Sequence, residues 1–170
     1  MLHPVNKLFS VILLLLFFCW PVCAQRPIDV QHYQYEISLS DLSDVIVGKA
    51  TIKIKFLAPA STVLLDLVGM KEEKGMKVFQ VKEDGKSVKF VHRQDRLEIR
   101  PDASAMANQL RTYEIDYMGV PEDGLIISSN KYGERTFFAD NWPNRARNWI
   151  PCVDDPADKA SVEFIVKAPE

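Results

Sequence analysis

Charged, aromatic and proline residues are concentrated in one stretch, residues 137–164, which reads FFADNWPNRARNWIPCVDDPADKASVEF. Four of its acidic residues are candidates for a calcium site: Asp154, Asp155, Asp158 and Glu163. Their spacing lacks the alternation of ligands and the central glycine of a calcium-binding loop. Three cationic residues lie nearby in the chain: Arg145, Arg147 and Lys159. The stretch is therefore predicted to hold a structural ion-pair cluster, and no metal ligand is assigned.

The rest of the chain offers no set of residues for nucleophilic or general-base catalysis. Cys152 lies between Pro151 and Val153 with no histidine or cationic base beside it, which is typical of a packed, unreactive thiol. His32 falls on the polar face of an alternating segment, where a solvated histidine is expected. The chain has no H-E-x-x-H pair, glycine-rich phosphate loop or G-x-S-x-G turn. No catalytic residue is therefore predicted.

The elements that must position these residues read as β-strands. Apolar and polar residues alternate over 30–39, 45–56, 96–100 and 109–117, and shorter apolar runs lie at 62–68 and 161–167. Segments 78–81 and 87–92 are predicted to form a hairpin around Asp84-Gly85, and 102–108 to form one helical turn. Gly48 suggests a bulge or a close approach of the backbone, and Asp66 needs a hydrogen-bond partner if it is buried. The pattern predicts an all-β sandwich or saddle-shaped antiparallel sheet.

The N-terminal segment, residues 1–24, has the layout of a secretory signal peptide. A weakly basic start is followed by the apolar run 8–20 and by the small residues before Gln25, which predicts cleavage after Ala24 and export to a periplasm or the exterior. A buried core helix and lipoprotein processing at Cys23 are the alternatives. Residues 25–170 are then enough for one domain with a substantial core. The formal net charge of −2 argues against a nucleic-acid or anionic-membrane partner, and no membrane anchor is expected after cleavage.

The signature segment, residues 147–164, resembles a sequence signature of the aminopeptidase N family of zinc metallopeptidases, which includes the leukotriene hydrolases. The matching positions are Arg147, Trp149, Pro151, Asp154 or Asp155, Pro156, Lys159 and Ala160. Shorter segments resemble other family strands in the same order: V-Q-H-Y at 30–33, G-K-A-T-I at 48–52, L-D-L at 65–67, Y-E-I-D-Y at 113–117 and G-L at 124–125. The resemblance implies the family's N-terminal β-domain, incomplete at its C-terminal end.

The resemblance also implies where the chemistry lies. Family members remove N-terminal residues from peptides with one zinc ion, which is held by two histidines and a glutamate in a later domain that also carries a G-x-M-E-N loop. The chain is therefore expected to lack a cofactor and peptidase activity alone, and to meet a peptide substrate only when joined to its catalytic domain. Asp140 and Trp142 match the family positions that line the first substrate pocket, although the family usually has glutamine or glutamate there. The structural alternative is that Trp142 packs and Asp140 caps a turn.

A function of another class is also compatible with the sequence. A free-standing, secreted β-sandwich could bind peptide or glycan, with an exposed strand edge accepting an extended peptide.

Overall fold

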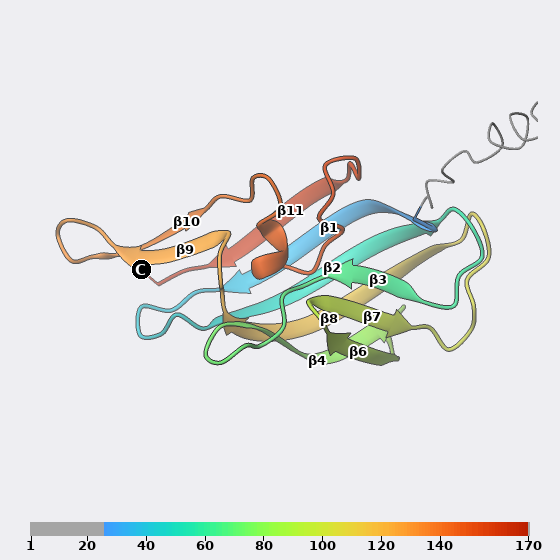
Figure 1. Ribbon diagram of the computed structural model, residues 1–170, viewed down its shortest axis with the longest axis horizontal. Coiled ribbons are helices and arrows are strands. Elements are labelled where there is room, and N and C mark those ends of the chain that lie inside the picture. The colour runs from blue at the N-terminus through green and yellow to red at the C-terminus, as the bar shows by residue number, and fades with distance from the viewer. Residues whose placement is uncertain (1–25, 170) are drawn as a thin grey trace, which may run out of the picture.

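The computed structural model describes residues 26–169, in which the regular elements are β-strands and one 3-10 turn (Figure 1). The predicted signal peptide lies outside the described residues. Within them, no helix is long and apolar enough to cross a membrane. The elements are β1 (Ile28–Ser38), β2 (Ile46–Phe56), β3 (Val63–Asp66), β4 (Gly75–Glu83), β5 (Lys86–Ser87), β6 (Lys89–Arg93), β7 (Arg96–Arg100), β8 (Leu110–Val120), β9 (Leu125–Ser129), β10 (Arg135–Ala139), the 3-10 turn η1 (Ala146–Asn148) and β11 (Ser161–Lys167).

The core lies between two sheets that share it. A six-stranded sheet has the order β11-β1-β2-β8-β4-β5, and the smaller sheet β3-β7-β6 lies over one of its faces (Figure 1). Alternate residues of the long strands point inward, as the period of two requires, so Ile52 and Ile115 of the large sheet join Leu65 and Ile99 of the small sheet in one buried cluster. The predicted all-β fold is confirmed.

Among the strands of residues 26–169, pairing is antiparallel with one exception. β11 pairs in parallel with β1, from His32 opposite Ser161 to Ser38 opposite Lys167, and lies at the edge of the large sheet. A parallel pair requires a crossover connection between its strands. Here the chain that leaves the two-stranded β9-β10 sheet supplies the last part of that crossover, through residues 140–160.

Two local predictions differ from the structure. The turn at Asp84-Gly85 forms, with φ of 46° and 83°, but β5 pairs with β4 for only two residue pairs. The buried Val88 then carries the chain into the small sheet, where β6 pairs with β7. Residues 102–108 contain no helical turn, because Ala105 instead bridges to Ala60.

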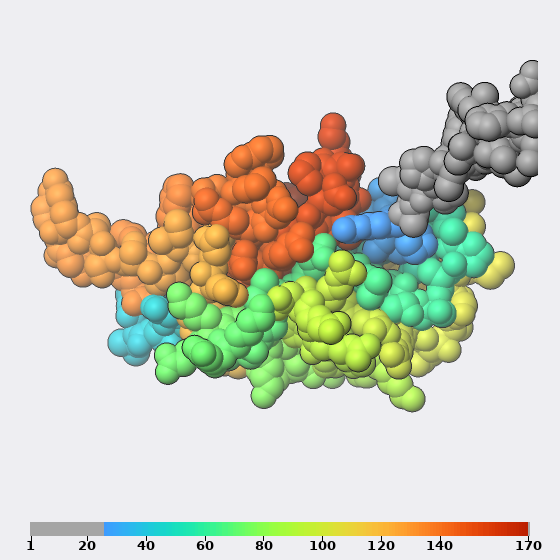
Figure 2. Space-filling model, in the orientation of Figure 1, coloured from blue at the N-terminus to red at the C-terminus, as the bar shows by residue number. Residues whose placement is uncertain are grey.

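The β9-β10 hairpin was not anticipated from the sequence. It extends away from the body of the molecule (Figures 1 and 2). Leu125, Ile127 and Phe137 lie on one face and Ile126 and Phe138 on the other, as the register dictates. The side chain of Arg135 pairs with Asp44, in the β1–β2 connection, and so ties the hairpin to the large sheet.

Candidate functional site

The signature segment crosses between the two sheets and holds them together. Its backbone forms a two-hydrogen-bond bridge to the end of β3: the Asp66 amide donates to the Cys152 carbonyl at 2.7 Å, and the Cys152 amide donates to the Asp66 carbonyl at 3.1 Å. From there the chain continues into β11, beside β1. The segment therefore links the small sheet to the edge of the large one.

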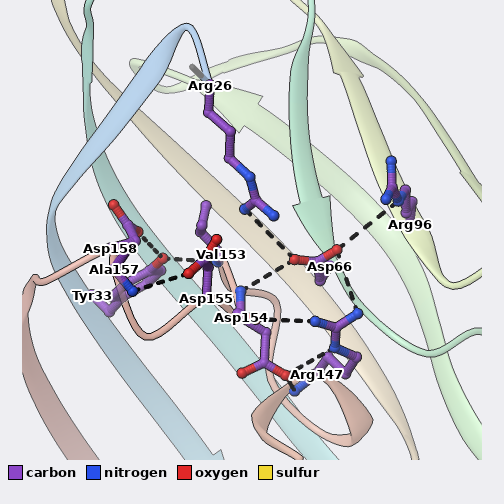
Figure 3. A network of polar contacts seen from close by, with 10 residues as sticks. All are labelled: Arg26, Tyr33, Asp66, Arg96, Arg147, Val153, Asp154, Asp155, Ala157 and Asp158. Atoms are coloured by element: carbon purple, nitrogen blue, oxygen red, sulfur yellow. Dashed lines mark hydrogen bonds and ion pairs between the residues drawn. The ribbon is translucent and has the colours of Figure 1, made fainter. Parts of the chain in front are cut away.

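A buried carboxylate, that of Asp66, lies at the centre of a polar cluster (Figure 3). Three arginines from separate parts of the chain approach it: Arg26 at 3.8 Å, Arg96 at 4.0 Å and Arg147 at 3.8 Å. The Asp154 amide donates a hydrogen bond to Asp66 Oδ2 at 3.1 Å. The partner that this aspartate was predicted to need is thus a set of charged and backbone groups.

Arg147 makes the shortest contacts of this cluster. Its Nε donates to Asp154 Oδ2 at 2.8 Å, and its Nη2 donates to the Asp154 carbonyl at 3.1 Å. The same guanidinium reaches Asp66, so one side chain joins the start of the signature segment, its middle and β3. Arginine suits this position because its planar fork serves several acceptors at once.

Two tyrosines of β1 bind the backbone of the same segment. The Tyr35 hydroxyl donates to the Pro151 carbonyl at 2.9 Å, and the Tyr33 hydroxyl accepts a hydrogen bond from the Val153 amide at 2.9 Å. Burial raises the pKa of both phenols well above the ordinary value, so both stay neutral. In the sequence these residues are recognisable only as inward positions of a strand, because alternation does not reveal which distant backbone group a hydroxyl contacts.

Trp149 is the buried aromatic residue of the signature segment. Its ring stacks on Phe164 of β11 at a centroid distance of 5.9 Å, and its Nε1 donates to Asn141 Oδ1 at 2.9 Å. A side chain on Gly124 would lie 2.3 Å from the Arg145 carbonyl and 3.0 Å from the Trp149 ring, so the G-L segment needs glycine there. A hollow of about 270 Å³ lies beside Trp149 and is lined mainly by apolar side chains, among them Leu125, Phe137 and Phe164.

Asp140 and Trp142 occupy the connection between β10 and η1. The Asp140 carboxylate accepts a hydrogen bond from the Trp142 amide at 3.3 Å, as a turn cap does, and pairs with Arg145 at 3.2 Å. The Trp142 side chain is 73% exposed and therefore does not pack, and its peptide bond to Pro143 is cis. Of the two structural roles considered from the sequence, the structure shows the turn cap by Asp140 but not the packing of Trp142.

The remaining charged residues of the signature segment do not join the cluster around Asp66. Asp155 accepts a hydrogen bond from the Ala157 amide in a local turn that contains Pro156, and Asp158 faces the Tyr33 hydroxyl at 3.5 Å. Lys159 is exposed and makes no ion pair among residues 26–169, and Arg145 pairs with Asp123 and Asp140, which lie outside the predicted set of acids. Of the three predicted cations, Arg147 alone pairs with one of the four predicted acids, Asp154, in the described residues. Arg26 and Arg96, which no sequence pattern marked as partners of an acid, are also members of the cluster around Asp66.

The remaining candidates have structural roles. Cys152 is a free, buried thiol, so the prediction of a packed thiol is confirmed, and burial raises its pKa well above the ordinary value, which disfavours the reactive thiolate. His32 Nδ1 lies 2.7 Å from Ser161 Oγ on the paired strand β11. No group of three His, Cys, Asp or Glu side chains in the described part of the chain could hold a metal ion, so these residues do not fit a zinc site.

Comparisons with known proteins define the class of the molecule. The family profile described as the peptidase M1 N-terminal domain matches residues 29–170. The M1 zinc metallopeptidase from Deinococcus radiodurans is similar in structure, with a TM-score of 0.71 and 26% identity over 85% of this chain and 33% of that chain. Leukotriene A4 hydrolase from Saccharomyces cerevisiae shares the fold, with a TM-score of 0.71 and 22% identity over 85% of this chain and 24% of that chain. No curated protein sequence matches the chain.

The chain belongs to the peptidase M1 family, through the N-terminal domain of that family. The resemblance recognised in the sequence is thereby confirmed. The chain spans about a third of the length of the Deinococcus radiodurans enzyme that it matches.

Proposed function

We propose that the chain is the N-terminal, non-catalytic portion of an exported zinc aminopeptidase and that it forms one wall of the substrate pocket. The observation that supports the wall is the exposed indole of Trp142. Trp142 follows Asn141 in the chain, and Asn141 is one of the residues that line the apolar hollow. Exposed aromatic rings are favourable surfaces for substrate side chains. A two-domain M1 zinc metallopeptidase that is 25% identical to this chain binds L-tryptophan.

The charge distribution supports an aromatic wall over an anionic one. A free aspartate in the wall could attract the substrate amine, yet one oxygen of Asp140 pairs with Arg145 and the other accepts a hydrogen bond from the Trp142 amide. Arg145 also approaches Asp123 at 3.5 Å. Asp140 is thus partly neutralised, and its main role is to fix the turn that presents Trp142.

Exposed apolar side chains support contact with a further part of a longer protein. Phe138 of β10 and Val162, Phe164 and Val166 of β11 are among the exposed large hydrophobic residues. Apolar surface of this kind commonly marks an interface. In the proposal, the catalytic domain covers part of this surface and supplies the zinc ligands, the glutamate base and the amine-binding loop.

A first experiment tests the assignment of activity. The 170-residue chain is expected to release no p-nitroaniline from leucine p-nitroanilide, whereas the product of the reading frame extended through downstream G-x-M-E-N and H-E-x-x-H motifs should release it in a chelator-sensitive manner. Hydrolysis by the short chain, or an extended locus without those motifs, would contradict the proposal. Edman sequencing of the exported product should begin at Gln25.

A second experiment tests the wall. In the longer enzyme, Trp142→Ala should raise KM for substrates with an aromatic N-terminal residue about tenfold and change kcat little, because a wall residue contributes to binding rather than to chemistry. Tyr132→Ala is the matched control, since Tyr132 is equally exposed but lies at the tip of the hairpin. Equal effects of the two variants would argue against a pocket wall.

The outer edge of β11 favours the alternative, a free-standing module that adds a peptide strand. β11 is an edge strand whose seven residues are all exposed. Circular dichroism and thermal melting of residues 25–170 distinguish the two functions. A soluble, cooperatively melting domain that binds extended peptides would favour the module, and an aggregating product would favour the enzyme fragment.

A further inference from the structure

A second hollow, of about 410 Å³, lies against the buried carboxylate of Asp66. Its charged lining residues are Arg26, Asp66 and Arg96, and its apolar ones include Pro27, Ile28 and Leu64. The hollow is remote in sequence from Asp140 and Trp142 and shares no lining residue with the hollow beside Trp149. Its volume is within the range of small-molecule sites.

Arg26 and Arg96 hold donors that the cluster does not use. Their nitrogens lie 3.8 and 4.0 Å from Asp66, which is beyond hydrogen-bond distance. Among residues 26–169 neither guanidinium makes a hydrogen bond, whereas Arg147 donates three to Asp154 through its guanidinium and backbone. Both side chains are also partly exposed, 43% for Arg26 and 63% for Arg96.

The charge of the lining favours an anion. Two guanidinium groups converge from two sides on one carboxylate (Figure 3), and that carboxylate already shares its charge with Arg147 and accepts the Asp154 amide. A ligand cation would therefore meet two arginines and an engaged acid. A carboxylate can take parallel hydrogen bonds from a guanidinium fork, which is among the strongest polar pairings in proteins.

We propose that this hollow binds the carboxylate of a small organic acid with an apolar body. Arg26 and Arg96 donate to the two carboxylate oxygens, and Ile28 and Leu64 contact the apolar part. Asp66 orients the two arginines through charge and makes no contact with the ligand. The site is separate from the proposed peptidase pocket, so it stands whether or not the longer protein is an aminopeptidase.

Binding is measured by ¹H–¹⁵N NMR titration of the 170-residue chain. N-acetyl-L-leucine is the probe, because its blocked amine prevents reaction at a peptidase site. It should bind saturably, with a Kd of about 1–10 mM. N-acetyl-L-leucinamide, which lacks the carboxylate, should not bind at the same concentrations. Sodium phosphate forms the third titration: binding as strong as that of the acid would overturn the preference for an organic ligand, and no binding of the acid would overturn the site.

Variants assign the binding to the two arginines. Arg96→Gln should weaken binding about tenfold, since it removes one charge-assisted hydrogen bond, and Arg26→Ala should do the same. Arg100→Gln is the control, because Arg100 lies on the same face of β7 but pairs with Glu98 at 2.8 Å. Circular dichroism checks that each variant folds. Arg96→Gln is expected to fold because the Arg96 side chain is mostly exposed. Unchanged affinity in a folded Arg96→Gln chain would refute the assignment.

Discussion

The Arg147 guanidinium contacts two carboxylates that are themselves almost fully buried, Asp66 and Asp154. Removal of the arginine leaves both acids with a weaker set of partners in a region of low dielectric, and an uncompensated buried charge is costly. The structure therefore gives this signature residue a role in holding the domain together.

Arg147→Met should lower the free energy of unfolding by about 2–3 kcal/mol, because it removes two hydrogen bonds and one of the charges that offset Asp66 and Asp154. Urea unfolding followed by circular dichroism measures the change. Arg100→Met breaks an exposed pair with Glu98 and should cost less than ~1 kcal/mol. Similar losses in both variants would mean that the Arg147 cluster adds nothing beyond an ordinary surface pair.

Asp158 gives the fold a pH dependence of definite sign. Partial burial raises the pKa of its carboxyl group above the ordinary value, and the negative charge of Asp29 acts in the same direction. The folded state therefore holds the proton more tightly than the unfolded state. The contribution of the protonated group to stability is present at low pH and is lost as the pH rises through the folded-state pKa.

Asp158→Asn should accordingly raise the melting temperature at pH 7, and the difference from the native chain should disappear near about pH 3, where the carboxyl group is protonated in both states. Differential scanning calorimetry at several pH values measures this difference. A variant that melts lower than the native chain at pH 7 would show that the ionised form is stabilised by its neighbours instead.

At the scale of the strand, Gly48 of β2 provides space for an aromatic ring of the next strand. It pairs with Tyr117 of β8, and a Cβ atom on Gly48 would lie 2.3 Å from the tyrosine ring. The glycine allows the large Tyr117 side chain to lie flat across the neighbouring strand inside the core. This is the close approach that a glycine within a strand suggests.

Gly48→Ala should reduce the free energy of unfolding by about 1–3 kcal/mol, because the added methyl group overpacks the core. Combination with Tyr117→Leu should cost less than the sum of the two single changes, since the smaller side chain gives the methyl group room. Chemical denaturation of the four proteins completes the cycle. Strict additivity would mean that the two residues do not compete for space.

The sequence predicts the individual strands well and their partners poorly. Alternation identifies β1, β2, β7 and β8 because one face of each is buried. The β9-β10 hairpin is mostly exposed and only Leu125 of its apolar residues is buried, so its sequence carries a weak alternation, although Leu125-Ile126-Ile127 and Thr136-Phe137-Phe138 around a Gly133 turn were available signals. The pairing of β3 with β7 depends on long-range packing that no local pattern encodes.

The candidate site shows the same division. Residue types alone indicated ion pairs around Arg147 and a packed Cys152, and the structure shows both. The resemblance to a family gave the order of the short motifs along the chain but did not explain why the fold needs those residues. In the structure Tyr33, Asp66 and Gly124 come from three of those motifs, and each of them meets residues 145–154.

At the scale of the whole molecule, the bridge between Asp66 and Cys152 ties the two sheets into one cooperative unit. The thiol of Cys152 should therefore become reactive only when the domain unfolds. In a urea series, alkylation of Cys152 by iodoacetamide, read by peptide mass spectrometry, should follow the same midpoint as the loss of strand circular dichroism. Alkylation at lower urea would show that the signature segment opens locally.

The parallel pairing of β1 with β11 also sets an order of events during biosynthesis. Ser161, which pairs with His32, follows it by 129 positions in the chain. At ordinary synthesis rates, the residues between the two strands take roughly 6–26 s to be synthesised, and the outer edge of β1 stays unpaired during that time. Throughout that interval a long strand bearing Tyr33, Tyr35 and Ile37 has an unpaired edge, which is a hazard for aggregation. Holding the nascent chain extended, as a chaperone does, would protect that edge until the last strand arrives.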